Sequence, residues 1–80
     1  MFFVYILKSE KDKTYYYGST EDISKRVEYH NSGKVRNTKG HIPYKFHYSE
    51  TFPTRSDAMV REKFFKSIDG YNWLKTKGVI

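Results

Sequence analysis

The strongest constraint on the fold of this chain lies near its N-terminus. Two runs of apolar and aromatic residues, FFVYIL (2–7) and TYYYGS (14–19), flank a polar segment. Short runs of strand-forming residues on either side of such a segment are typical of a β-hairpin. We therefore predict strands over 2–7 and 14–19, joined by a turn over 8–13. The first run is apolar at consecutive positions, which favours a central strand covered on both faces.

The register of this hairpin decides which tyrosine lies opposite Tyr5. If Lys8 pairs with Lys13, Tyr5 lies opposite Tyr16. A turn that differs by one residue places Tyr5 opposite Tyr17 instead. Because successive side chains of a strand point to opposite faces, the two registers put different tyrosines on the face of Tyr5. The sequence leaves both registers open.

A helix and a third strand are expected to follow the hairpin. We predict that the helix has Thr20 as its N-cap, carries Glu21 and Asp22 in its first turn, and ends near Gly33. Alternation of aromatic and polar residues over 44–52 predicts a half-buried strand. Its apolar face is expected to hold Tyr44, Phe46 and Tyr48.

A second helix and a short helical tail complete the expected order of elements. Thr54, followed three residues later by Asp57, is typical of a helix N-terminus. Apolar residues at helical spacing continue to Ile68, and we expect Gly70 to end this helix. A short final helix is expected over 71–75. The resulting order, β-β-α-β-α with a short C-terminal helix, predicts an α+β fold in one domain over 1–80.

Three polar side chains lie at the borders of these apolar helix faces. Arg26 and His30 are four residues apart, which places them one turn apart on the same side of the first helix. Glu62 lies at the margin of the second apolar face, where a carboxylate is either paired or functional. Arg61 falls inside that face, and we expect it to contact Asp57 or aromatic rings.

The charge balance favours a polyanionic partner. Lys and Arg number 15 against 9 for Asp and Glu, which gives a net charge of +6 and a pI of about 9.6. Without cysteine, a disulfide scaffold and a thiolate metal site are excluded. No apolar run approaches the ~20 residues that span a bilayer, and we expect a cytoplasmic protein without membrane contact. The candidate nucleic-acid contacts are Lys25, Lys34, Arg36, Lys39, His41 and Lys45, although the basic segment 34–43 is equally consistent with an ordinary solvated loop.

The polar candidates together suit phosphodiester cleavage. A carboxylate holds a hard divalent cation, and the metal and an arginine neutralise charge on phosphoryl oxygens. A phenol or imidazole takes a proton from the attacking water. Each residue alone also has a structural explanation, since tyrosine is common in strands and Arg, His and Glu are common on helix surfaces.

Four short motifs, in order, resemble the GIY-YIG nuclease superfamily, particularly its small single-domain bacterial members. Phe3-Val4-Tyr5 stands where the family has Gly-Ile-Tyr, and Tyr16-Tyr17-Gly18 stands where it has Tyr-Ile-Gly. Arg26 and His30 match the arginine and histidine of the family's helix. SDAMVREK (56–63) is similar to the segment that carries the family's metal-binding glutamate. The chain departs from the family pattern at Phe3, which replaces the first glycine, and at Tyr17, which replaces the isoleucine. Asn72 follows Glu62 at a shorter spacing than the asparagine of larger family members, and the role of that asparagine is not carried over to Asn72.

The resemblance implies a three-stranded antiparallel sheet flanked by helices, with one catalytic cleft. It implies Mg²⁺ or Mn²⁺ on Glu62, an arginine that stabilises the pentavalent phosphorus, and a histidine that accepts a proton or binds phosphate. One of the two tyrosines acts as a general base or orients the water, and the sequence does not say which. The implied site consists of Tyr5, Tyr16, Arg26, His30 and Glu62.

Three functions compete on the sequence alone. The leading hypothesis is a metal-dependent endonuclease domain that hydrolyses phosphodiester bonds in DNA, as in repair or recombination. The second is a non-catalytic nucleic-acid-binding module of the same fold, with RNA as an alternative target. The third is a protein-interaction module that uses the aromatic surface. The first ranks highest because all five site residues are present together, and a partner protein can supply its targeting.

Overall fold

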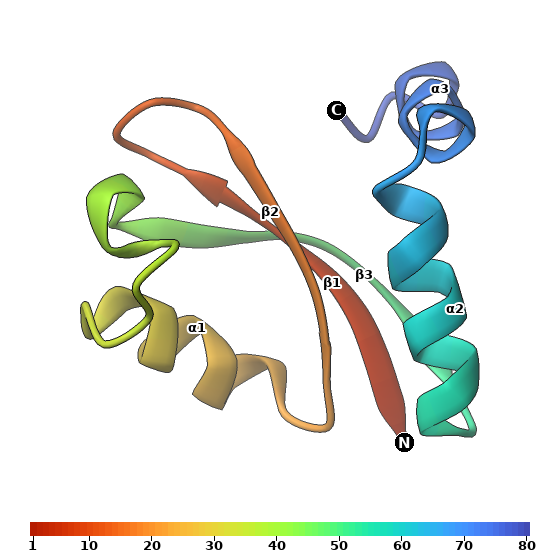
Figure 1. The fold of residues 1–80 in the computed structure, drawn as a ribbon, viewed down its shortest axis with the longest axis horizontal. Helices are drawn as coiled ribbons and strands as arrows, with labels where there is room; N and C mark the ends of the chain where they lie inside the picture. The colour runs from red at the N-terminus through yellow and green to blue at the C-terminus, as the bar shows by residue number, and fades with distance from the viewer.

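The computed structural model describes all 80 residues of the chain. It is an α+β fold in which three antiparallel strands form one sheet in the order β2-β1-β3 (Figure 1). The fold class expected from the sequence is therefore confirmed. The elements are β1 Phe2–Ser9, β2 Tyr15–Thr20, α1 Ile23–Asn31, the short 3-10 helix η1 Lys39–His41, β3 Tyr44–Phe52, α2 Arg55–Phe65 and α3 Ile68–Thr76.

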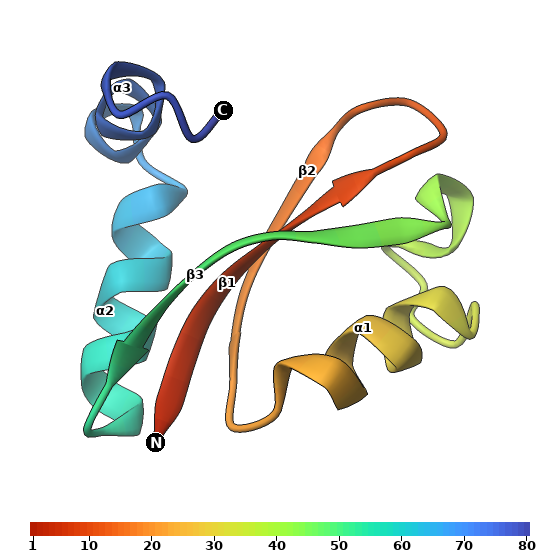
Figure 2. The same cartoon turned by 180° about the vertical axis from the view of Figure 1, so that it is seen from behind.

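The sheet separates α1 from the other two helices (Figures 1 and 2). Strand β1 is covered on both faces, as predicted, because alternate side chains enter two different clusters. On the α1 face, Tyr5 and Leu7 pack with Tyr44. On the opposite face, the cluster is formed by Val4, Ile6, Phe65 and Leu74. None of the helices is both long enough and apolar enough to cross a bilayer.

The hairpin register differs from both predicted registers. Tyr5 lies opposite Gly18, and Tyr16 lies on the same face of the sheet as Tyr5. Strand β1 continues to Ser9, whose backbone N–H donates to the carbonyl of Thr14 (2.8 Å). Strand β1 therefore ends at Ser9 rather than at residue 7, and β2 spans Tyr15–Thr20 rather than 14–19, so the turn is shorter than predicted and every pair between the strands is shifted.

Local polar contacts hold the shortened turn over 10–13. The Ser9 hydroxyl oxygen accepts hydrogen bonds from the backbone N–H groups of Lys11 and Asp12, both at 3.2 Å. Lys13 takes a left-handed backbone conformation with a φ of 65°. Residues other than glycine seldom adopt this conformation, so the composition of the turn did not reveal it.

Strand β3 has the predicted bounds, but its alternation is broken by a bulge. The register with β1 shifts at His47, so the residues before and after it change faces. Tyr44 packs toward α1, whereas Tyr48 packs with the cluster under α2 and α3. The prediction that these two tyrosines share a face with Phe46 was wrong.

The helix caps agree with the sequence for α2 and differ for α1. Thr54 caps α2, with its hydroxyl oxygen accepting from the backbone N–H three residues later (3.1 Å). The N-cap of α1 is Asp22, whose carboxylate accepts in the same way (3.0 Å). Thr20, the predicted cap, is the last residue of β2. Glu21 and Asp22 therefore precede the first turn of α1.

Helix α2 ends earlier than predicted, and a separate helix takes its place. Phe65 is its last residue, and Ser67 caps α3 by accepting from the backbone N–H of Gly70 (3.1 Å). Gly70 lies inside α3, where a Cβ atom would be 1.8 Å from the carbonyl oxygen of Phe64. Gly70 therefore does not end α2 as predicted, and its lack of a side chain allows α2 and α3 to cross closely. Ile68 is 80% exposed and belongs to no apolar face.

Arg61 joins α2 to β3 and α3. Its guanidinium donates to both carboxylate oxygens of Glu50 (2.8 and 3.3 Å) rather than to Asp57. It also lies 4.4 Å from the ring centroid of Trp73, so the predicted contact with aromatic rings is confirmed. The Tyr48 hydroxyl donates to the same carboxylate. Burial and this carboxylate raise the pKa of Tyr48 to about 12.

Candidate active site

The hydroxyl of Tyr5 is the centre of the candidate site. Tyr5 comes from the middle of β1, is fully buried, and faces α1. Its hydroxyl lies over Gly18 of β2, where a Cβ atom would be 2.5 Å from the phenolic oxygen. Real Cβ atoms do not approach other atoms this closely. The glycine of the second hairpin motif therefore makes room for the tyrosine of the first.

His30 approaches the same hydroxyl from the last turn of α1. Its Nε2 atom lies 3.2 Å from the Tyr5 hydroxyl oxygen. Its Nδ1 atom lies 3.0 Å from the hydroxyl oxygen of Thr38, which precedes η1. The side chains of all three residues are fully buried. Thr38 could not be predicted from the sequence, because it lies in an irregular segment where no periodicity marks a buried position.

The hydrogen-bond network assigns the tautomer of His30. The carbonyl of Val35 can only accept, so the Thr38 hydroxyl donates to it (3.3 Å) and accepts from the Nδ1–H of His30. Nε2 then carries the lone pair and accepts from the Tyr5 hydroxyl. Burial lowers the pKa of His30 below its usual value, and the positive charge of Arg26 adds to this. A neutral imidazole at pH 7 agrees with the acceptor role of Nε2.

Arg26 brings positive charge to the Tyr5 hydroxyl. The phenol of Tyr5 beside its guanidinium raises the pKa of Arg26 above its usual value. The guanidinium also lies 5.2 Å from the ring centroid of Tyr29. Its Nε atom is buried without a hydrogen-bond partner. Leaving a charged donor unpaired is costly, and an anionic oxygen of a ligand would satisfy it.

A polar groove of about 680 Å³ adjoins Arg26, between the end of β2 and the starts of α1 and α2. Lys25 and Arg55 line it together with Arg26, so three basic side chains surround one opening. Arg55 pairs only weakly with Glu21, at 3.8 Å between two largely exposed side chains. Arg55 carries no signal in the sequence, because only the packing of α2 against the sheet brings it to this groove.

Tyr16 completes an aromatic wall beside the hydroxyl. Its ring centroid is 4.5 Å from that of His30 and 6.3 Å from that of Tyr5. The structure thus brings together four of the five predicted site residues: Tyr5, Tyr16, Arg26 and His30.

Glu62 comes from the helix that packs on the other face of the sheet. It lies on α2, is half-buried, and accepts a hydrogen bond from Lys66 (2.8 Å). It shares no hydrogen bond with the other four predicted residues. Burial raises the pKa of Tyr5 above its usual value, Arg26 opposes this, and the charge of Glu62 adds to it. Among the contributions to the pKa of Tyr5, that of Glu62 is the smallest.

Comparison with known proteins identifies the family. Residues 1–72 match the model of a family described as the GIY-YIG catalytic domain. The chain belongs to the GIY-YIG family. This family is a nuclease superfamily, so the hydrogen-bonded Tyr5 lies in a domain type built for phosphodiester chemistry.

Curated relatives of this GIY-YIG domain carry the name UPF0213. The chain is 39% identical over 71 residues to a UPF0213 protein of Bacillus licheniformis, covering 88% of this chain and 72% of that one. It is 46% identical over 66 residues to UPF0213 protein YsiG of Lactococcus lactis, covering 81% and 62%. The solution NMR structure of a UPF0213 protein from Bacillus halodurans is similar, with a TM-score of 0.55, 31% identity, and coverage of 95% and 84%.

GIY-YIG nucleases generally use a divalent metal, so the side chains of this chain that could hold a metal ion need to be considered. No group of three or more His, Asp or Glu side chains is placed to hold a metal ion. Glu62 is the carboxylate that the sequence predicts for this role. A single carboxylate fits Mg²⁺, which keeps several waters and completes its shell with substrate phosphate. The residues present therefore fit a cation shared with the substrate.

The predicted nucleic-acid contacts of this GIY-YIG domain lie in different places. Lys25 lines the groove beside Arg26, whereas Lys45 lines a second pocket elsewhere. The segment between α1 and β3 carries three exposed basic side chains that form no ion pair: Lys34, Arg36 and Lys39.

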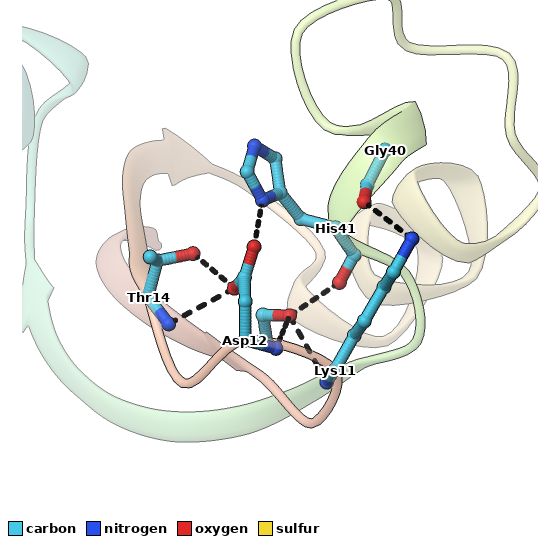
Figure 3. A network of polar contacts seen from close by, with 6 residues as sticks. Lys11, Asp12, Thr14, Gly40 and His41 are labelled. Carbon is cyan, nitrogen blue, oxygen red and sulfur yellow. Dashed lines mark hydrogen bonds and ion pairs between the residues drawn. The ribbon is translucent and has the colours of Figure 1, made fainter.

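His41 has a structural partner. Its ring pairs with the carboxylate of Asp12, and the Nζ of Lys11 donates to the carbonyl of Gly40 (3.2 Å) (Figure 3). Hydrogen bonds from Thr14 and then from His41 hold the pKa of Asp12 well below its usual value. These contacts fasten the hairpin turn to the segment before β3.

Proposed function

We propose that this chain is a divalent-metal-dependent endonuclease domain that hydrolyses phosphodiester bonds in DNA. The observation that carries the proposal is the buried chain from Tyr5 through His30 to Thr38, beside a guanidinium with an unpaired Nε. A purely structural role would not require a buried guanidinium nitrogen without an acceptor. The family membership supports the same activity class.

The protonation states favour a proton relay. The raised pKa of Tyr5 keeps its phenol protonated at pH 7, so it does not act as a preformed phenolate. As water attacks the phosphorus, its proton passes to the Tyr5 oxygen while the Tyr5 proton passes to Nε2 of His30. The bond from phosphorus to the leaving oxygen breaks, and that oxygen takes a proton from solvent. Tyr5 is thus the general base, supported by His30.

Arg26 and Glu62 act on the charged groups of the substrate. The free Nε of Arg26 suits a phosphoryl oxygen, where it stabilises the added negative charge of the transition state. Glu62 would hold the divalent cation, which when bound supplies Lewis-acid stabilisation of the phosphoryl oxygens. Lys25 and Arg55 extend the positive charge along the groove.

The decisive experiment is a cleavage assay with matched variants. Wild-type protein is incubated with nicked, branched, duplex and single-stranded DNA in millimolar Mg²⁺ or Mn²⁺, and with EDTA. We expect metal-dependent cleavage that falls by ~10²-fold or more in Tyr5→Phe, as for loss of a general base, and that is abolished in Glu62→Gln. Tyr71→Phe and Glu28→Gln, both on exposed helix surfaces, serve as controls and retain activity.

Two outcomes would count against the proposal. Full activity in Glu62→Gln would remove Glu62 from the mechanism. Binding of DNA or RNA by folded wild-type protein, with no cleavage of any substrate in either metal, would favour a non-catalytic binding module.

A further inference from the structure

A second basic pocket lies at the turn end of the hairpin. It has a volume of about 520 Å³, and its lining includes the side chains of Lys8, Lys13, Lys45 and His47. We propose that this pocket is a second phosphate-binding site, which holds the backbone of a single-stranded nucleic-acid segment. The inference rests on the proposed function only for the identity of the phosphate-bearing partner.

Two of the lysines lie side by side on neighbouring strands of the sheet. Lys8 of β1 is the direct cross-strand partner of Lys45 of β3. Like charges at opposed positions destabilise a strand pair. Neither lysine takes part in any of the four ion pairs of the structure. A phosphate between the two ammonium groups would relieve their repulsion.

The third lysine is presented by a braced turn. Lys13 has a φ of 65°, a conformation that is unfavourable for a residue with a side chain. The turn keeps this conformation because Asp12 accepts hydrogen bonds from Thr14 and pairs with His41 (Figure 3). The residue with this unfavourable backbone conformation, Lys13, is thus one whose side chain lines the pocket.

Aromatic rings hold part of the lining in place. The Nζ of Lys8 lies 5.4 Å from the ring centroid of Tyr15, and the ring of His47 lies 5.2 Å from the same ring. His47 also bonds the carbonyl of Val79. An ammonium already packed on a ring loses less side-chain entropy when it binds an anion. Glu10 also lines the pocket and opposes an anion, but three lysines outnumber it.

The position of the pocket points to a flexible strand. Lys8 lies on the sheet face of α2 and α3, whereas Tyr5 lies on the face of α1, since side chains alternate along β1. The molecule measures only 28 × 26 × 17 Å along its principal axes. Duplex DNA has a persistence length of about 50 nm and does not bend around such a body, whereas a single strand does. The second site therefore suits a single-stranded extension of the substrate.

The first test is residue-resolved NMR without metal, so that no cleavage occurs. A short single-stranded oligonucleotide and inorganic phosphate are titrated separately at constant ionic strength. We expect the oligonucleotide to shift the amide signals of Lys8, Lys13 and Lys45, and a double variant, Lys8→Gln with Lys45→Gln, to lose these shifts. Lys63→Gln with Lys75→Gln removes the same charge from exposed helix positions and keeps them. A response to inorganic phosphate alone would overturn the nucleic-acid assignment.

The second test compares a duplex with and without a single-stranded tail. The tail should strengthen wild-type binding by about tenfold, consistent with a few added phosphate contacts. The gain should vanish in the Lys8/Lys45 double variant and persist in the Lys63/Lys75 control. An equal gain in both variants would overturn the inference and leave the proposed nuclease untouched. Tail binding through the pocket by a protein that cuts nothing would overturn the nuclease alone.

Discussion

At the scale of single residues, the candidate site is organised by what surrounds one phenolic oxygen. Gly18 gives the Tyr5 hydroxyl its space, His30 is its hydrogen-bond partner, and Arg26 lies beside it. Thr38 touches none of the reacting atoms in the proposed mechanism, but it determines which nitrogen of His30 is protonated. Thr38 is therefore a positioning residue, and its effect on Tyr5 passes entirely through the imidazole.

Replacement of Thr38 tests this indirect role. Thr38→Val keeps the shape of the side chain but removes the acceptor for Nδ1–H, so the proton is free to move to Nε2. We expect a loss of ~10-fold or more in kcat with little change in KM, because the relay to a general base is weakened. Imidazole ¹⁵N shifts should report the changed tautomer. Thr38→Ser should restore both readouts, and an unchanged tautomer in Thr38→Val would contradict the assignment.

Replacement of Gly18 tests the close approach of Tyr5. Gly18→Ala forces the phenolic oxygen away from a Cβ atom that would lie 2.5 Å from it. We expect a destabilisation of about 1–3 kcal/mol, as for overpacking, and a larger relative loss of activity than of stability. Gly40→Ala is the matched control, because no atom lies within 4 Å of its added Cβ. Equal effects of the two substitutions in urea unfolding would contradict the packing argument.

At the scale of elements, α1 carries most of the charged chemistry on one turn. Arg26 and His30 are placed together by the helical repeat alone, and the helix is short, with nine residues. A short helix owes its stability to packing and caps rather than to propensity. Glu62 depends on a different element, α2, so the complete site requires both helices to sit correctly on the sheet.

The cap of α1 can be tested separately from the site. Asp22→Ala removes the acceptor for the N–H of Lys25 and should cost about 0.5–2 kcal/mol in the free energy of unfolding. Glu21→Ala is the matched control, since it loses only an exposed ion pair worth ~0–1 kcal/mol at most. Urea unfolding of both variants measures the difference. A larger loss in Glu21→Ala would show that the cap has been assigned to the wrong residue.

At the scale of the whole molecule, three helices cover a three-stranded sheet so that β1 is enclosed between two clusters. The site is built into the wall of this core, because Tyr5, His30 and Thr38 are all fully buried. The protonation of the site is therefore coupled to the stability of the fold.

This coupling predicts a pH dependence of stability. The folded-state pKa of His30 is lowered, so the unfolded chain takes up this proton at a higher pH than the folded protein does. The free energy of unfolding should therefore fall as the pH drops below about 6.5, by up to ~1.4 kcal/mol per pH unit. Urea unfolding of wild type and His30→Gln from pH 7 to pH 5 measures this. Equal pH slopes for the two proteins would contradict the buried neutral state.

Several features were accessible to local reasoning. The order of strands and helices, the bounds of β3 and the cap at Thr54 follow from periodicity and capping chemistry, which act over a few residues. The placement of Arg26 and His30 on the same side of α1 is also local, because the helical repeat brings residues four apart to one side of a helix. The buried, doubly covered β1 follows from its continuous apolar run.

The sequence by itself therefore determined the elements, their order and the residue types of the site. The tertiary structure alone decided the hairpin register, the end of α2, the role of Thr38 and the second basic pocket. Each of these depends on which backbone groups meet across the sheet or between helices, and such contacts join residues far apart in the chain. These contacts are determined by local features: the left-handed conformation of Lys13, the bulge at His47 and the close helix crossing at Gly70. None of these features leaves a periodic pattern in the sequence.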